Sequence, residues 1–294
     1  MNIVMLGHSQ AGKTTYMALM YSTMNNGPYG FEVLCQDRAQ HQQLLLAARA
    51  VLRGDYPPPT DHRQVYELKL RHGPSDLVDF RWRDHRGGAL TERSTSGQSA
   101  ELRRDLLAAD ALVVFVDAYE LLTSPRGARK VRSLMAPITA ALADRTTFAP
   151  LVIALTKCDL LGDDDDVRRF NQAFDPLINA VQQSRHVYGT LIELACGPQP
   201  QNVVGPVLFC LYWAIAKRAE ELNGHIESAM RQAAAYQAQN HLVGRWRAAW
   251  RGEPHPGWSA AEMLNRAQAQ YAQLQPLIEP GKRLENLLGE LPLF

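Results

Sequence analysis

The chain has 294 residues, of which 46% are hydrophobic, and its 31 basic side chains nearly balance its 30 acidic ones. This length and composition allow a full hydrophobic core, arranged in one or two domains. A formal net charge of +1 excludes a whole-chain attraction to nucleic acid or to acidic partners. The four cysteines include no Cys-x-x-Cys pair, which is typical of a reducing compartment such as the cytoplasm.

No segment of the sequence indicates a membrane protein. The longest apolar stretch, residues 203–216, contains Gly205 and Pro206 and is shorter than the roughly 20 residues that span a bilayer. Residues 2–6 lack the basic flank of a signal peptide, and neither end carries a lipidation motif. We therefore expect a cytoplasmic protein without an integral membrane segment.

Strand-like and helix-like segments alternate over the first two thirds of the chain, as a parallel sheet with crossover helices requires. The predicted strands are residues 3–6, 65–70, 78–82, 111–116, 151–155 and 191–194. The predicted helices between them are residues 13–24, 98–108, 129–143, 168–184 and 207–222. We predict an α/β fold with a mostly parallel six-stranded sheet and helices on both faces.

Two further regions stand outside this alternation. Residues 30–60 form an insertion with a candidate edge strand at 30–37, a predicted helix at 38–53 and three consecutive prolines that hold the chain extended. After about Gly224 the strand pattern stops, which predicts a domain of residues 1–222 and a helical C-terminal extension of residues 223–294. Within the extension we expect a helix at 226–250, a capping box at Ser259 that starts a second helix, and a short helix near 284–288.

A phosphate-binding motif follows the first predicted strand. Residues 7–14 read Gly-His-Ser-Gln-Ala-Gly-Lys-Thr and match G-x-x-x-x-G-K-[ST], the P-loop of nucleoside-triphosphate-binding proteins (NTPases). Backbone N–H groups of such a loop and the start of the next helix bind phosphate oxygens. Lys13 would reach the β- and γ-phosphates, and the Thr14 hydroxyl would bind Mg²⁺. The nucleotide-binding residues predicted here are Gly7, Ser9, Gln10, Ala11, Gly12, Lys13, Thr14 and Thr15.

A second motif follows the apolar strand at 151–155, where the chain reads Thr156-Lys157-Cys158-Asp159. A carboxylate can accept hydrogen bonds from both the N1–H and the exocyclic amino group of guanine, and adenine offers no such pair. Asp159 would therefore reject adenine, because its charge would be left unpaired. Lys157 would lay its aliphatic stem along the base. The position of the motif at the C-terminal end of a strand favours this interpretation over a solvated turn.

Together with Asp84-His85-Arg86-Gly87, which matches D-x-x-G, these motifs resemble the Ras-like small GTPases of the TRAFAC class. The nearest group is that of the bacterial small-GTPase-like or "double-GTPase" proteins, and the resemblance covers about residues 1–222. It implies GTP or GDP and Mg²⁺ as ligands. Asp84 and the switch residue Thr60 would join Thr14 around Mg²⁺, and the Gly87 N–H would meet the γ-phosphate. The backbone of Ala195 and Cys196 would contact the guanine oxygen.

The resemblance implies GTP hydrolysis that depends on Lys13, Thr60 and Gly87, but one position departs from the Ras pattern. Gly88 stands where Ras-type proteins carry the glutamine that orients the attacking water. Intrinsic hydrolysis would then be slow or assisted by a partner, because an arginine finger supplied in trans is worth about 10³–10⁵-fold. His85 or Arg86 in cis is a further hypothesis, which rests on adjacency alone.

Three functions remain open at this point. The leading one is a GTP-hydrolysing switch that an effector or activating protein reads, with a nucleotide-dependent oligomer as a further arrangement. The second is a GTP- or GDP-binding scaffold with little hydrolysis, which Gly88 favours. The third is a P-loop ATPase or nucleotide kinase, against which Asp159 argues.

Overall fold

The structure is a computed structural model that describes residues 1–58, 64–84, 97–162, 167–240, 255–289, 291 and 293. Its contacts divide the chain into two compact units. The first unit comprises Met1–Trp213 together with Leu287–Phe294, and the second comprises Ala214–Asn286.

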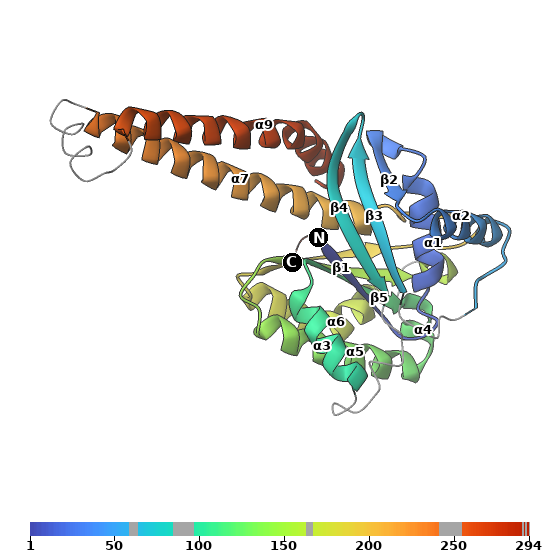
Figure 1. Ribbon diagram of the computed structural model, residues 1–294. Coiled ribbons are helices and arrows are strands. Elements are labelled where there is room, and N and C mark those ends of the chain that lie inside the picture. The colour runs from blue at the N-terminus through green and yellow to red at the C-terminus, as the bar shows by residue number, and fades with distance from the viewer. Residues whose placement is uncertain are drawn as a thin grey trace. The chain divides into compact units, whose positions relative to one another are not determined.

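The first unit is built on a seven-stranded sheet with the strand order β2-β3-β4-β1-β5-β6-β7 (Figure 1). The strands are β1 (Asn2–Leu6), β2 (Phe31–Cys35), β3 (Gln64–His72), β4 (Ser75–Asp84), β5 (Ala111–Asp117), β6 (Ala149–Thr156) and β7 (Val187–Glu193). Neighbouring strands are parallel from β4 through β1, β5 and β6 to β7. Strand β3 pairs antiparallel with both β2 and β4. The predicted α/β class is confirmed. The sheet has one strand more than the six that we predicted, because the candidate edge strand forms β2 and pairs with β3.

Helices cover both faces of the sheet. The first unit contains α1 (Lys13–Met24), α2 (Arg38–Leu52), α3 (Gly97–Ala108), α4 (Ala118–Thr123), α5 (Pro125–Ala143), α6 (Val167–Gln183) and the start of α7 (Gly205–Gln239). One face of the sheet forms a single apolar core with side chains of α3, α4, α5 and α6. Against the other face, the Tyr16 ring of α1 lies 4.9 Å from Phe115 and 6.0 Å from Trp82. Strands β5 and β6 are buried almost throughout, as their apolar sequences require.

The insertion packs on α1. Asp37 caps α2, since its carboxylate accepts hydrogen bonds from the backbone N–H groups of Ala39 (2.7 Å) and Gln40 (3.1 Å). Ala48 and Val51 of α2 are fully buried in a cluster that includes Leu19 of α1. A short 3₁₀ turn, η1 (Pro28–Gly30), leads into β2. The helix predicted for the insertion is therefore present.

Helices α4 and α5 meet at a glycine. Helix α4, which was not predicted from the sequence, is capped by Asp117, whose side chain accepts a hydrogen bond from the Glu120 N–H (2.9 Å). A Cβ at Gly127 of α5 would lie 2.2 Å from the carbonyl oxygen of Glu120. No side chain fits in that space, so α5 can lie against α4 only because residue 127 is glycine.

The described part of the second unit lies in two long helices, α7 and α9 (Pro256–Leu288). Its apolar seam repeats at spacings of three and four residues, as in a coiled coil. The buried seam residues include Leu222, Ala229, Ala233, Ala260, Met263, Ala267, Leu277 and Leu284. Among the described residues, no helix has the length and apolar character needed to cross a membrane.

Several predicted boundaries were wrong. Strand β7 begins at Val187 rather than near residue 191, and α7 runs through Gly224 without a break. Helix α9 starts at Pro256, so Ser259 lies inside the helix and not at its cap. A proline at the first helical position is itself a start signal. The two helices predicted after residue 258 form one continuous helix. Residues 241–250 of the helix predicted at 226–250 lie outside the described residues.

Candidate functional site

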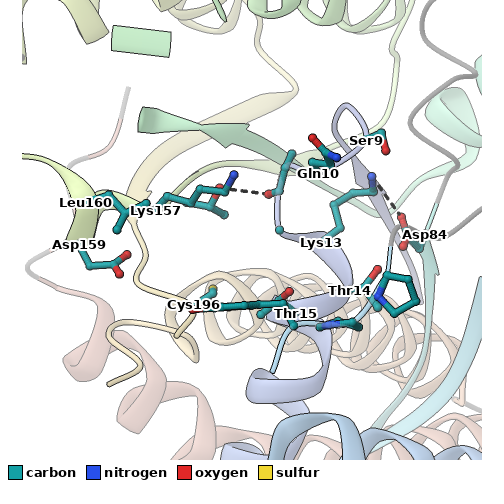
Figure 2. A pocket seen from close by; sticks show the side chains of 16 residues that line it. Ser9, Gln10, Lys13, Thr14, Thr15, Asp84, Lys157, Asp159, Leu160 and Cys196 are labelled. Carbon is teal, nitrogen blue, oxygen red and sulfur yellow. Dashed lines mark hydrogen bonds and ion pairs between the residues drawn. The ribbon is translucent and has the colours of Figure 1, made fainter. Parts of the chain in front are cut away.

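The carboxyl ends of the parallel strands border one pocket with a volume of about 560 Å³ (Figure 2). The strand register aligns these ends, because Met5 pairs with Asp84 and Asp117 pairs with Thr156. Ligand sites of open α/β sheets gather at this edge. The pocket is lined by Ser9, Gln10, Ala11, Gly12, Lys13, Thr14, Thr15, Tyr56, Pro57, Pro58, Asp84, Thr156, Lys157, Asp159, Leu160 and Cys196.

The loop that follows β1 requires glycine at two positions. Gly7 has φ +152°, and a Cβ there would lie 2.7 Å from the carbonyl oxygen of Phe115. Gly12 has φ +80° and caps the N-terminus of α1. A chain with other residues at these positions would be strained or would clash with β5. The loop thereby wraps tightly between β1 and α1, and residues 9–15 line the pocket.

His8 ties the outside of this loop to α5. Its Nε2 lies 2.8 Å from the carbonyl oxygen of Lys130 and 3.1 Å from the hydroxyl of Ser133. Burial lowers the pKa of His8, and the neighbouring Lys130 and Lys13 lower it further, while the hydrogen bond to the Lys130 carbonyl and Glu120 oppose the shift. The imidazole therefore stays neutral near pH 7 and acts as an anchor for the loop.

Lys13 is buried at the base of the loop. Its ammonium donates hydrogen bonds to the carbonyl oxygens of Gly7 (2.9 Å) and His8 (3.4 Å) and lies 3.9 Å from Asp84 Oδ1. Burial lowers the pKa of Lys13, and the Asp84 carboxylate opposes the shift. The base of the loop thus holds a buried positive charge, and within the described residues its one ion-pair partner is Asp84.

Asp84 is buried at the end of β4, with only 3% of its surface exposed. Its Oδ1 has no hydrogen-bond partner among the described residues. Burial raises the pKa of Asp84 to about 6, although Lys13 opposes the shift. A buried carboxylate oxygen without a hydrogen-bond partner lowers the stability of the fold, and a bound hard cation would remove this penalty. With Thr14 lining the same pocket, these oxygen donors fit a magnesium ion.

The loop after β6 is braced by two side chains. The Thr156 hydroxyl lies 3.1 Å from the carbonyl oxygen of Ala11 and 3.2 Å from that of Val116, so it links this loop to the loop after β1. Lys157 has φ +61° and its ammonium forms an ion pair with the Asp117 carboxylate. Asp117 was missed by sequence analysis, although an acidic residue at the end of a wholly apolar central strand was a usable signal.

Asp159 presents an exposed carboxylate to the pocket from the 3₁₀ turn η3 (Cys158–Leu160). It has no hydrogen bond or ion pair within the described part of the chain. Beside it, burial raises the pKa of the Cys196 thiol to about 12, so this thiol stays protonated. Ala195 is buried and exchanges two backbone hydrogen bonds with Gln201, at 3.0 and 3.3 Å.

Most of the predicted site residues share this one pocket (Figure 2). Gly7 and Ala195 do not line it, although the Gly7 carbonyl oxygen holds Lys13. Four lining residues were not predicted from the sequence: Tyr56, Pro57, Pro58 and Leu160. The predicted switch residues Thr60, His85 and Gly87, together with Arg86 and Gly88, lie outside the described residues.

A parallel sheet with a glycine-framed, lysine-bearing loop at its carboxyl edge defines a P-loop nucleotide-binding protein. Residues 2–188 match the family model described as Double-GTPase 2. The chain therefore belongs to the Double-GTPase 2 family and is a GTP-binding protein of the P-loop class. The matched region includes the loop after β1 and residues 156–159, and it ends before Ala195 and Cys196.

Comparison with solved structures found distant similarities. The mammalian SRP receptor is 13% identical with a TM-score of 0.41, covering 67% of this chain and 92% of that one. A signal recognition particle receptor SRb-GTP/SRX complex from Chaetomium thermophilum is 13% identical with a TM-score of 0.41, covering 71% and 96%. An ADP ribosylation factor-like GTP-binding protein from Encephalitozoon cuniculi, in complex with GDP, is 14% identical with a TM-score of 0.34, covering 70% and 74%. No curated protein sequence matches the chain.

Proposed function

We propose that the chain is a Mg²⁺-dependent switch of the cytoplasm that binds GTP and GDP and hydrolyses GTP slowly or with the help of a partner. One observation carries this proposal: Lys13 and Asp159, from loops far apart in the sequence, line the same pocket. A cation that suits phosphates and an unpaired carboxylate that suits guanine are thereby available to one nucleotide.

At the phosphate end of the pocket, which we define as residues 9–15 with Asp84, backbone N–H groups and Lys13 bind the phosphates. Lys13 already lies against the loop's own carbonyl oxygens, so it needs little reorganisation to reach an anion. Thr14 and Asp84 would hold a magnesium ion, which would neutralise charge at the phosphates. The orphaned Oδ1 of Asp84 supports this assignment.

At the base end, which we define as residues 156–160 with Cys196 and residues 56–58, Asp159 accepts hydrogen bonds from the guanine edge. The ion pair between Lys157 and Asp117 fixes Lys157, whose stem then lies along the base. Cys196 adds backbone contacts. The buried hydroxyl of Thr156 holds this end of the pocket in place relative to the loop after β1.

Hydrolysis and switching depend on Thr60, His85 and Gly87, whose roles remain predictions from the sequence. Gly88 supplies no side chain to orient the attacking water, so we expect slow turnover that an activating protein accelerates. An effector would read the same segments. A nucleotide-dependent oligomer is an alternative source of the missing group.

A competition experiment tests the guanine assignment. The purified chain with Mg²⁺ should bind GDP at least about 100-fold more tightly than ADP, because adenine leaves Asp159 unpaired. The variant Asp159→Asn should lose about 100-fold in GDP affinity and gain affinity for xanthosine diphosphate. Asp175→Asn, on the exposed side of α6, is the matched control and should change neither. Equal affinity for GDP and ADP would favour a P-loop ATPase.

Single-turnover phosphate release separates the switch from the scaffold. Slow but measurable release, faster in the presence of a partner, supports the switch, whereas no release under either condition supports a GTP- or GDP-binding scaffold. The variants His85→Ala and Arg86→Ala test catalysis in cis. Rates equal to those of the wild type would remove both residues from the mechanism.

A further inference from the structure

The start of α5 carries more positive charge than its surroundings neutralise. Arg126, Arg129 and Arg132 are exposed on this helix, and we call them the arginine row. Within the described residues, no carboxylate forms an ion pair with any of the three. The single carboxylate of α4, that of Glu120, is already paired with Lys130 at 2.7 Å. Three guanidinium groups therefore face solvent without a counter-charge from this part of the chain.

This placement of the arginine row lowers the stability of α5. The N-terminus of a helix carries partial positive charge, and the first turn of α5 contains Arg126 and no acidic residue. Arg129 lies three residues from both Arg126 and Arg132, so like charges are neighbours on the helix surface. The Nε atoms of Arg129 and Arg132 lie 3.5 and 3.3 Å from the carbonyl oxygens of Pro125 and Ala128, which leaves the outer nitrogens available. A charge pattern that weakens a helix in a nearly neutral chain indicates a binding surface.

The same stretch of α5 also braces the nucleotide pocket. The carbonyl oxygen of Lys130 lies 2.8 Å from Nε2 of His8, in the loop after β1. The ammonium of Lys130 holds Glu120, whose backbone N–H donates a hydrogen bond to Asp117 (2.9 Å). Asp117 in turn forms the ion pair with Lys157 at the base end of the pocket. A contact made by the start of α5 can therefore influence both ends of the pocket.

The arginine row fits an acidic protein segment better than a nucleic acid or a membrane. Its residues span about 9 Å along the helix axis, which matches a short peptide segment. Carboxylates bind guanidinium groups in bidentate pairs. Helix α5 has no aromatic residue on which bases could stack. Its apolar side is buried in the core of the first unit and is not available to a bilayer.

We propose that the arginine row docks an acidic segment of a partner protein, and that the docked segment slows release of the bound nucleotide. Carboxylates beside the row remove the repulsion among the arginines and stabilise the start of α5. Lys130 belongs to that stretch of helix, so the contact of its carbonyl oxygen with His8 is stabilised as well. The effect on release rests on the proposed function, because it requires a nucleotide in the pocket, whereas docking itself does not.

Fluorescence anisotropy of a labelled oligoglutamate peptide tests docking on the full chain with GDP and Mg²⁺ at low ionic strength. The combined variant Arg126→Gln, Arg129→Gln and Arg132→Gln should bind the peptide about 3- to 150-fold more weakly, as expected for the loss of three exposed ion pairs.

A matched control removes the same charge from the exposed surface in and beside α2. The combined variant Arg38→Gln, Arg49→Gln and Arg53→Gln lowers the net charge equally but leaves the arginine row intact. Its affinity for the peptide should stay within about twofold of the wild type, because the long-range attraction that it alters is weak for exposed charges.

Release of radiolabelled GDP tests the effect on the nucleotide. Saturating oligoglutamate should slow release from the wild type at least about fivefold, the lower end of the usual coupling between two sites. In His8→Ala the peptide should bind with wild-type affinity but change release less than about twofold, because the contact with the Lys130 carbonyl oxygen is lost. Ser133→Ala removes the other contact of His8 and should retain the effect. Unchanged peptide affinity in both variants shows that α5 is folded.

Three results would overturn the proposal: an equal loss of peptide binding in the row variant and the α2 control, unchanged GDP release from the peptide-bound wild type, or slowed release that persists in His8→Ala. Tighter binding of oligouridylate or of phosphatidylserine vesicles through the same arginines would also overturn it, because the occupant would then be a nucleic acid or a membrane. A wild-type chain that binds the peptide but no guanine nucleotide would instead refute the proposed function. The two failures are therefore distinguishable.

Discussion

The two ends of the pocket are built in different ways. At the phosphate end the two charged groups, Lys13 and Asp84, are buried, and every residue except Asp84 comes from one continuous segment, whose carbonyl oxygens hold Lys13. At the base end the groups are exposed or half-buried and come from three separate segments, which contribute Tyr56, Asp159 and Cys196. One end is preformed by packing, and the other is assembled from short loops.

This difference separates affinity from selectivity. A buried cation at a helix N-terminus attracts phosphates whatever base is attached to them, and burial strengthens that attraction. An exposed carboxylate contributes less to affinity but rejects the wrong base. We therefore expect changes at the phosphate end to abolish binding, and changes at the base end to alter selectivity and release rate.

The largest expected effect is at Lys13. Lys13→Ala removes the charge-assisted hydrogen bonds to the phosphates, each worth about 1.5–3 kcal/mol, so GDP affinity should fall about 100- to 1000-fold or more. Isothermal titration calorimetry measures this directly. Lys69→Ala, at a half-exposed site on β3 outside the pocket, is the control. If Lys13→Ala weakened GDP by less than Asp159→Asn did, the assignment of affinity to the phosphate end would be wrong.

The next effect concerns the buried charge of Asp84. Burial raises its pKa to about 6, above the value of about 4 in an unfolded chain. The protonated carboxyl therefore stabilises the fold below about pH 4, and this stabilisation is lost as pH rises through about 6. In the metal-free, nucleotide-free protein, Asp84→Asn should raise the free energy of unfolding by about 1–3 kcal/mol at pH 7 and hardly change it at pH 4.

Urea unfolding at the two pH values checks this expectation, with the exposed Asp79→Asn as the control. The same Asp84→Asn variant should lose the effect of Mg²⁺ on GDP binding. If Asp84→Asn raised the free energy of unfolding equally at both pH values, ionisation of the buried Asp84 carboxyl would not be what destabilises the wild-type fold at pH 7.

The smallest expected effect is at Thr156, which connects the two ends. Thr156→Val keeps the shape and removes the hydroxyl, so the bond to the Ala11 or Val116 carbonyl oxygen is lost. We expect a loss of about 1 kcal/mol in the free energy of unfolding and a several-fold faster GDP release. Thermal unfolding and GDP release measure the two effects. A loss of stability with no change in release would indicate that the two loops act independently.

Sequence alone predicted the phosphate end more completely than the base end. The motif around Lys13 is contiguous, and its glycines indicate the backbone geometry that the loop requires, so all of its pocket-lining residues were predicted. The contact of His8 with α5, outside the pocket, was not predicted. The class of fold also followed from the alternation of segments. Tyr56 and Asp117 were missed because their roles depend on contacts across the fold that no local pattern records.

Boundaries that depend on tertiary packing were also missed. Separate helices were predicted at residues 207–222 and 226–250, yet α7 continues through Gly224, because buried residues such as Leu222 and Ala229 stabilise the helix on both sides. The length of β7 was underestimated because its first residues, beginning at Val187, alternate in exposure and lack a continuous apolar run. In both cases tertiary packing overrides the local secondary-structure propensity of the residues.

The close approach of α5 to α4 at Gly127 has a consequence for mutational tolerance. The loop after β1 is anchored from outside by His8 on the carbonyl oxygen of Lys130, one turn along α5 from Gly127. Any side chain at residue 127 would displace α5 and move that anchor. Gly127 should therefore tolerate substitution as poorly as the phosphate-binding glycines do, although it does not line their pocket.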